Sequence, residues 1–207
     1  MFLEFITVKF CKVSISKLKK HNGGFQMTTS TIKTLKAFNL LQWIEENKSE
    51  LKPPVNNKVL WEDSEFICMI LGGPNRRRDF HVDPSEEFFY QIKGSCFVEV
   101  INFEGKREVV EVKEGEVFML PAMMPHSPHR IADTYGLVIE RKRDQGELED
   151  FVWFCENCDQ QMHKKTVQLT NIETQVKGAI EEFNSSEELR TCDNCGHVMP
   201  EEVGLWK

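Results

Sequence analysis

The chain has 207 residues, 40% hydrophobic and 29% charged, so it can bury a substantial core and is not expected to be disordered throughout. Its formal net charge of −7 and the lack of a long basic stripe argue against nucleic-acid binding. No run of about 18 apolar residues occurs, which argues against a membrane span. We therefore expect one globular domain with at most a small appendage.

The first 26 residues differ from the rest. They carry five lysines and one acid, a net charge of +4, so the remainder must carry −11. A basic, acid-poor leader is typical of a mitochondrial transit peptide, but this one has no arginine, and Met27 directly precedes the part that looks folded. We interpret residues 1–26 as a dispensable or mis-started leader and expect a cytoplasmic protein. A mitochondrial location is the alternative if the leader is real.

After the leader, the pattern predicts one short helix and then many strands. The apolar residues between Leu40 and Ile44 share a helix face, with Asn39 as N-cap and Pro53 and Pro54 ending the helix. From Val59 onward, short β-branched and aromatic runs separated by turn residues favour an all-β barrel or sandwich. The expected strands are Phe66–Leu71, Glu87–Ile92, Cys96–Ile101, Glu108–Val112, Glu116–Leu120 and Leu137–Ile139.

Three residues in the β region form a candidate iron site. His81 and Glu87 are separated by a turn-forming segment, and His126 follows the run Gly115–Pro121. Two imidazoles and one carboxylate can occupy one face of an octahedral Fe(II) and leave three positions for substrate and dioxygen. Zinc would bind the same ligands but cannot change its oxidation state. A lone histidine is more often an ordinary core or surface residue, so the prediction depends on the joint spacing.

That spacing resembles the two signature motifs of the cupin superfamily, whose fold is a small double-stranded β-helix barrel. Two departures occur: Asp83 replaces the second histidine of the usual His-x-His, and Met123 stands where the second motif usually has glycine. We interpret Asp83 as a turn residue or a neighbour of the ligands, and a weak ligand role stays open.

Arginines near the triad indicate an anionic substrate. Because side chains alternate along a strand, Arg77 and Asp79 should share the face of His81, while the other arginines of the triplet 76–78 should point away. Arg130 at a strand end would add a second cationic fork. An arginine fork binds a carboxylate through two parallel hydrogen bonds, so we expect a substrate carboxylate near the metal.

Four runs closely resemble the 3-hydroxyanthranilate 3,4-dioxygenase family. They are KPPVNN (Lys52–Asn57), GGPNRRRDFHVDPSEEFFYQIKG, LPAMMPHSPHR (Leu120–Arg130) and LVIERKR (Leu137–Arg143). The resemblance covers about Asn39 to the C-terminus. It implies opening of the ring of 3-hydroxyanthranilate by dioxygen to 2-amino-3-carboxymuconate semialdehyde, in the kynurenine route to quinolinate and NAD, by a homodimer.

The resemblance also implies a set of site residues. Catalytic roles would fall to Glu140, as acceptor of the hydroxyl proton, and to Arg77 and Arg130, as holders of the carboxylate. The full set is His81, Glu87 and His126 for Fe(II), and Arg77, Glu87, Arg130, Glu140, Asn57 and Asp79 for the substrate.

A second metal site is expected near the C-terminus, because two Cys-x-x-Cys pairs stand 33 residues apart. Four thiolates suit tetrahedral zinc or iron, and the family's version resembles rubredoxin, but the spacing does not separate the two metals. Redox dithiols are the alternative, and no βαβ context supports them. The ligands would be Cys155, Cys158, Cys192 and Cys195.

We expect a cupin catalytic domain at residues 27–150 and a C-terminal metal-binding segment at residues 151–207, with a strand at Thr166–Leu169 and a helix at Val176–Phe183. One rival is another cupin enzyme, such as a thiol dioxygenase or a sugar-phosphate isomerase, and the arginines weigh against the isomerase. The other is a cupin ligand sensor joined to a zinc ribbon, and the acidic balance weighs against DNA as its partner.

Overall fold

The computed structural model describes residues 36–52, 56–75 and 77–201, so the leader expected at residues 1–26 and Arg76 lie outside the described residues. The chain divides at Asn39, and the fold described here is that of the unit beginning at Leu40. Among the described residues, no helix is both long enough and apolar enough to cross a membrane.

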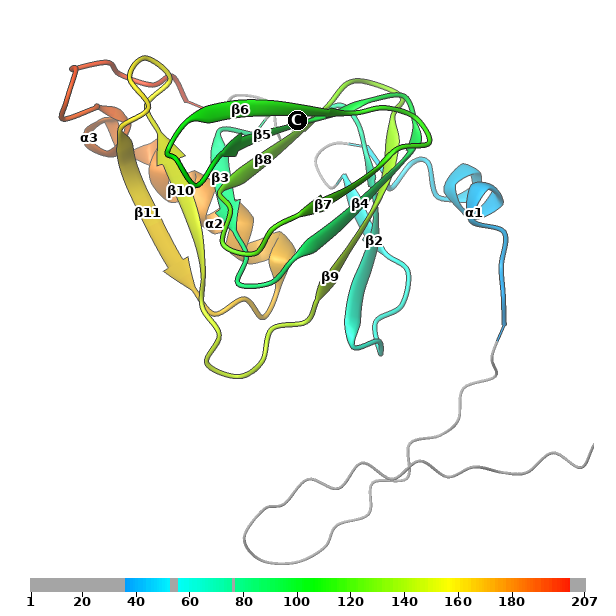
Figure 1. Ribbon diagram of the computed structural model, residues 1–207. Helices are drawn as coiled ribbons and strands as arrows, with labels where there is room; N and C mark the ends of the chain where they lie inside the picture. The colour runs from blue at the N-terminus through cyan, green and yellow to red at the C-terminus, as the bar shows by residue number, and fades with distance from the viewer. Residues whose placement is uncertain (1–35, 53–55, 76, 202–207) are drawn as a thin grey trace, which may run out of the picture. The chain divides into compact units, whose positions relative to one another are not determined.

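Two antiparallel sheets make up most of this unit and confirm the prediction of a mainly β barrel (Figure 1). In spatial order, the first sheet contains β1 (Asn57–Val59), β2 (Phe66–Gly72), β9 (Tyr135–Arg141), β4 (Glu87–Lys93) and β7 (Val117–Leu120). The second contains β11 (Gln161–Val167), β10 (Glu149–Phe154), β3 (Asp79–Val82), β8 (His126–Arg130), β5 (Cys96–Ile101) and β6 (Arg107–Val112).

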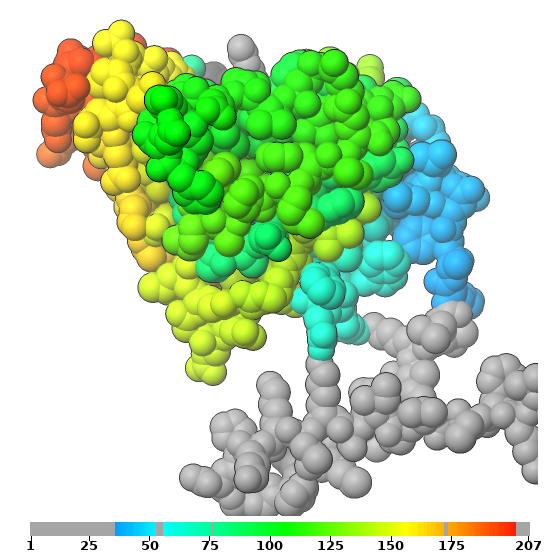
Figure 2. Space-filling view, viewed as in Figure 1, coloured from blue at the N-terminus to red at the C-terminus, as the bar shows by residue number. Residues whose placement is uncertain are grey.

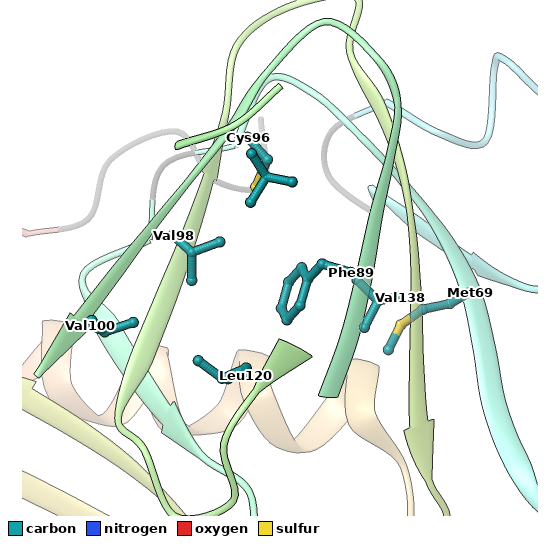
Figure 3. Packing of buried hydrophobic residues seen from close by; sticks show 8 residues of the cluster. Met69, Phe89, Cys96, Val98, Val100, Leu120 and Val138 are labelled. Atoms are coloured by element: carbon teal, nitrogen blue, oxygen red, sulfur yellow. The ribbon is translucent and has the colours of Figure 1, made fainter. Parts of the chain in front are cut away.

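The main core lies between the two sheets, and Figure 3 shows side chains from both of them pointing into this space. On β5, Cys96, Val98 and Val100 are buried while Phe97 and Glu99 are partly exposed, which is the alternation expected of a strand with one face in a core. In Figure 2 the side chains of β5 to β7 fill the gap that the ribbons leave. The core members are Met69, Phe89, Cys96, Val98, Val100, Val112, Leu120 and Val138.

Strand β8 was not among the expected strands because Pro128 stands in its middle, and proline has no N–H to donate. The strand pairs with β5 along its whole length, but its pairing with β3 is limited to His81 and His126. Beyond that pair, the side chain of Asn75 makes hydrogen bonds to the free edge of β8. Its side-chain amide donates to the Pro128 carbonyl, and its side-chain oxygen accepts from the Arg130 N–H. One asparagine thus keeps this proline-containing strand inside the sheet.

The first helix, α1 (Leu40–Glu46), ends before the prolines that the sequence suggested as its stop. The Trp43 carbonyl accepts from both the Asn47 N–H, at 3.1 Å, and the Asn47 side-chain amide, at 2.7 Å, and a turn from Asn47 to Glu50 follows. Ile44 is buried, whereas Leu41 of the expected apolar face is 62% exposed.

The C-terminal part continues the second sheet. Strand β10 pairs with β3 on one side and β11 on the other, so the expected boundary after residue 150 falls inside a strand of the barrel sheet. The expected strand is β11, which begins and ends earlier, and the expected helix is α2 (Ile172–Ser185), followed by α3 (Glu187–Arg190). These elements enclose a second core of Phe151, Trp153, Val176, Ala179, Ile180, Phe183 and Met199.

Candidate metal and substrate site

The three expected iron ligands come together in the barrel. His81 is on β3, His126 begins β8 directly opposite it, and Glu87 begins β4 in the facing sheet. The Glu87 Oε1 atom lies 3.4 Å from His81 Nδ1 and 3.1 Å from His126 Nε2, and all three residues are buried. A facial set of two imidazoles and one carboxylate therefore exists in the fold.

The site fits a divalent cation on two counts. One ligand atom from each of the three residues lies within 4.8 Å of the others. The central Glu87 Oε1 receives no hydrogen bond from the described residues, although a buried carboxylate oxygen without a partner is costly. His126 Nδ1 lies 3.1 Å from the Met124 carbonyl and, by donating to it, keeps Nε2 as the free ligand atom.

Carboxylates dominate the electrostatics around His81. Burial disfavours the charged ring, but the hydrogen bond with Glu149 and the negative charges of Glu87 and Glu149 outweigh burial and raise the pKa of His81 to about 10. Burial also opposes ionisation of Glu87, yet the His126 and His81 rings hold the pKa of Glu87 well below its usual range. This surplus of negative charge is the environment in which a bound cation is stabilised.

Glu140, which the family resemblance implies as the proton acceptor, lies next to Glu87 in the fold. It is opposite Glu87 in the β4–β9 ladder, so both side chains lie on the same face, and it is buried. Burial, together with the Glu87 charge, raises the pKa of Glu140 to about 8, against the opposing effect of Arg143. A carboxylate with a pKa near neutrality can take up a proton and return it at neutral pH.

Arg130 offers a free cation in the barrel. Its side chain is 3% exposed, and its Nε and Nη1 atoms have no hydrogen-bond partner among the described residues. It shares the inward face with His126, because the two residues stand four apart on β8. Gly136 on β9 packs next to this group, since a Cβ there would lie in ordinary contact with Arg130 Nη2, at 3.5 Å. An anionic substrate group would accept the hydrogen bonds that Nε and Nη1 do not make within the described residues.

The other expected substrate residues have partners within the protein. The guanidinium of Arg77 forms a two-bond ion pair with the fully buried Asp79, with Nε 3.0 Å from Oδ1. The shared face of Asp79 and His81 is as expected, but the Arg77 fork is directed at this aspartate. Asn57 on β1 is half-buried and lies 4.0 Å from the Met69 sulfur.

Sequence reasoning missed Arg143 and Glu149. Arg143, whose side chain is 2% exposed, forms ion pairs with Asp83 at 2.6 Å, with Glu149 at 2.7 Å and with Glu140 at 3.2 Å. Glu149 also lies 2.9 Å from His81 Nε2. The available signal was an arginine and an acid in a charged run, which normally indicates a solvated loop. The interpretation of Asp83 as a turn residue agrees with its Oδ1, which accepts from the N–H and hydroxyl of Ser85.

The four cysteines also come together. The Sγ atoms of Cys155 and Cys195 and those of Cys158 and Cys192 are each 3.6 Å apart, close to the edge of about 3.8 Å expected for a tetrahedron with metal–sulfur bonds of about 2.3 Å. Each pair sits in a similar turn, in which the first cysteine's carbonyl accepts from the residue four positions later. A side-chain hydrogen bond from Asn157 helps lower the pKa of Cys195 to about 6.

Known proteins resemble the chain over most of its length. A family model described as 3-hydroxyanthranilic acid dioxygenase matches residues 32–184. The 3-hydroxyanthranilate 3,4-dioxygenase of Bacillus thuringiensis is 76% identical over 175 residues, covering 84% of this chain and 98% of that protein. The enzyme of the same name from Burkholderia cenocepacia is 45% identical, covering 82% and 96%. A solved cupin-2 domain containing protein from Shewanella frigidimarina is 14% identical at a TM-score of 0.35, covering 41% and 78%.

Proposed function

The chain belongs to the 3-hydroxyanthranilic acid dioxygenase family, and on that premise we propose that it opens the ring of 3-hydroxyanthranilate with dioxygen, using Fe(II) held by His81, Glu87 and His126. The observation that carries the proposal is the meeting of this triad with the buried Glu140, which stands opposite Glu87 and has a pKa raised to about 8. Arg130, whose Nε and Nη1 atoms have no hydrogen-bond partner among the described residues, lies on the same face of β8 as His126 and supports a carboxylate-bearing substrate. The family is metal-dependent, and the choice of iron rests on the need for a metal that changes oxidation state.

Fe(II) at the triad would supply the redox chemistry of dioxygen activation and open coordination positions for the substrate's ring hydroxyl and amine. The protein would supply orientation. Arg130 would bind the substrate carboxylate through two parallel hydrogen bonds, and so fix the ring beside the triad. Arg77, whose guanidinium also pairs with Asp79, would assist in holding this carboxylate.

Glu140 would accept the proton of the ring hydroxyl. Its pKa of about 8 is well above that of an ordinary glutamate, which makes it a stronger base once ionised. Arg143, paired with it at 3.2 Å, would stabilise the ionised form before the proton arrives. An ionised ring oxygen makes the aromatic ring more electron-rich, which favours attack by dioxygen.

Beyond the catalytic site, we infer a zinc or iron ion at the four cysteines, with a structural role for the C-terminal segment. We also infer a homodimer located in the cytoplasm, with the mitochondrion as the alternative if residues 1–26 are a real transit peptide.

The decisive experiment is oxygen uptake by the purified, anaerobically Fe(II)-loaded protein on addition of 3-hydroxyanthranilate, with the semialdehyde product followed by its absorbance. We expect one dioxygen consumed per ring opened, and loss of both signals in Glu87→Ala. A demonstrably iron-loaded protein that consumes no oxygen would contradict the substrate assignment. Tight nucleic-acid binding by such an inactive protein would favour the sensor reading instead.

A further inference from the structure

We propose that Glu149, held by Arg143, is a positioning residue that orients His81 toward the catalytic metal and fixes which ring nitrogen carries the proton. This inference deepens the proposed function and rests on it for the identity of the metal site. Neither Glu149 nor Arg143 is among the site residues expected from the sequence.

The first argument is the contact with the ligand itself. His81 presents Nδ1 to Glu87, at 3.4 Å, and Nε2 to Glu149 Oε2, at 2.9 Å. An imidazole has two nitrogens, so a proton held on one leaves the lone pair of the other for a metal. A carboxylate at Nε2 therefore fixes both the ring angle and the tautomer that a metal ligand requires.

The second argument is that Glu149 cannot move away from this position. Its side chain is fully buried, and the same Oε2 atom accepts from Arg143 Nε at 2.9 Å and from Nη2 at 2.7 Å. Arg143 is held in turn by Asp83 at 2.6 Å, and Asp83 is fixed by two hydrogen bonds from Ser85. The chain of contacts thus runs from a turn of the backbone to the metal ligand.

Strand pairing provides a third, independent restraint. His81 on β3 stands directly opposite Phe151 on β10, and the two rings stack with centroids 5.3 Å apart and planes 18° from parallel. Glu149 lies two residues before Phe151 on the same strand, and therefore on the same face. Strand β10 thus contacts the His81 ring twice: Phe151 stacks on its face, and Glu149 binds Nε2 at its edge.

Glu149 binds its partners through one carboxylate oxygen, which allows its hydrogen bonds and its charge to be tested separately. All the hydrogen bonds to Glu149 involve Oε2, whereas Oε1 has no partner among the described residues. In Glu149→Gln, the amide oxygen can occupy the Oε2 position and accept the same bonds, with the NH₂ group at the Oε1 position. This variant keeps the geometry and removes the charge, while Glu149→Ala removes both.

The experiment measures Fe(II) dissociation constants by anaerobic chelator competition, together with EPR spectra of the nitrosyl complex, in the wild type and both variants. Glu149→Ala should bind Fe(II) about 10–100-fold more weakly and show an altered spectrum. Glu149→Gln should stay within about threefold of the wild type, because its hydrogen bonds remain. Wild-type affinity and spectrum in folded Glu149→Ala, or an equal loss in both variants, would overturn the proposal.

A matched control is available on β5. Glu99 also joins a histidine and an arginine, with His129 Nε2 at 3.3 Å and Arg107 Nη1 at 2.6 Å, but it projects from the outer face of the sheet. Glu99→Ala should leave the Fe(II) dissociation constant unchanged. A loss there equal to that of Glu149→Ala would mean that any broken carboxylate pair disturbs the site, which would contradict a specific positioning role.

The wild type provides a test that does not depend on how the variants fold. With Zn(II) as a diamagnetic probe, ¹⁵N NMR of the His81 ring should show one metal-bound nitrogen and one nitrogen carrying a slowly exchanging proton. A second nitrogen without a proton would overturn the proposal. None of these readouts involves substrate, so a wild type that binds Fe(II) normally but opens no ring would contradict the proposed function alone.

Discussion

At the scale of single residues, Arg130 shows how a binding site is maintained at a cost to stability. Burying a guanidinium whose Nε and Nη1 atoms have no partner among the described residues is unfavourable, and the fold tolerates it on the face of β8 that also carries His126. We propose that the substrate carboxylate is the compensating partner.

Replacing Arg130 with Met should therefore raise KM by about 10–100-fold, since a hydrogen bond to a charged group contributes about 1.5–3 kcal/mol. Fe(II) content should not change, and the free protein should be no less stable than the wild type. Steady-state kinetics, iron analysis and urea unfolding check these three expectations. Arg107→Met, which removes an arginine bound to Glu99 and Asp159 outside the site, is the control and should leave KM unchanged. An unaltered KM in Arg130→Met would refute the assigned role.

Arg77 should behave differently, because its fork already binds the buried Asp79. We expect Arg77→Ala to raise KM while Fe(II) stays bound, and also to lower the free energy of unfolding, since it leaves a buried carboxylate unpaired. Combining it with Asp79→Asn should recover part of the lost stability without recovering KM. Loss of iron in Arg77→Ala would show that the role assigned to this residue is wrong.

The residues that the sequence identified and those that it missed differ in how their positions are determined. His81, Glu87 and His126 belong to a pattern of fixed spacing, and the structure brings them together. Glu149 is 68 residues from His81 and contacts it because β10 pairs with β3. No local sequence pattern predicts that pairing.

At the scale of elements, local chemistry predicted most strands, but their limits only where the pattern was regular. Strand β5 has the expected bounds because its alternation is regular and its ends are marked by turns. Strand β8 was missed because proline argues against a strand interior, and the compensation comes from Asn75, 53 residues away along the chain. Similarly, α1 ends at Glu46, before the prolines that the sequence suggested as its stop.

Packing of β2 gives a prediction at this scale. A Cβ added at Gly72 would lie 2.1 Å from the backbone oxygen of Leu51, so Gly72→Ala must displace backbone and should destabilise by about 1–3 kcal/mol or more. The control is Gly178→Ala on α2, where a Cβ meets nothing within 4 Å and should stabilise by about 0.5–1 kcal/mol. Urea denaturation measures both. Equal stability of the Gly72→Ala protein and the wild type would contradict this packing.

At the scale of the whole unit, the two metal sites belong to one framework. Strand β10 carries Glu149 and Phe151 beside His81, continues with Trp153 into the second core, and is followed directly by Cys155. The sequence predicted both sites, because each is a motif. It divided them between two segments, because nothing local shows that a single strand serves both.

Removal of the second metal should weaken the C-terminal segment more than the catalysis. We expect Cys155→Ser to lose about one metal ion per chain, to unfold at a lower temperature and to be cleaved more readily by protease near residues 155–201, since structural metal sites contribute directly to folding. Folded, iron-loaded protein should keep its turnover. Complete loss of turnover in such a protein would show that the cysteines have a catalytic role.

The position of β10 also limits how the chain can be shortened. A protein ending at Asp150 would leave β3 without its neighbour over most of its length, and so turn an interior strand into an open edge. Exposed edges of this kind template pairing between molecules. The shortened protein would therefore be prone to aggregate even though His81, Glu87 and His126 were still present, and its yield of soluble protein would fall before its chemistry could be assayed.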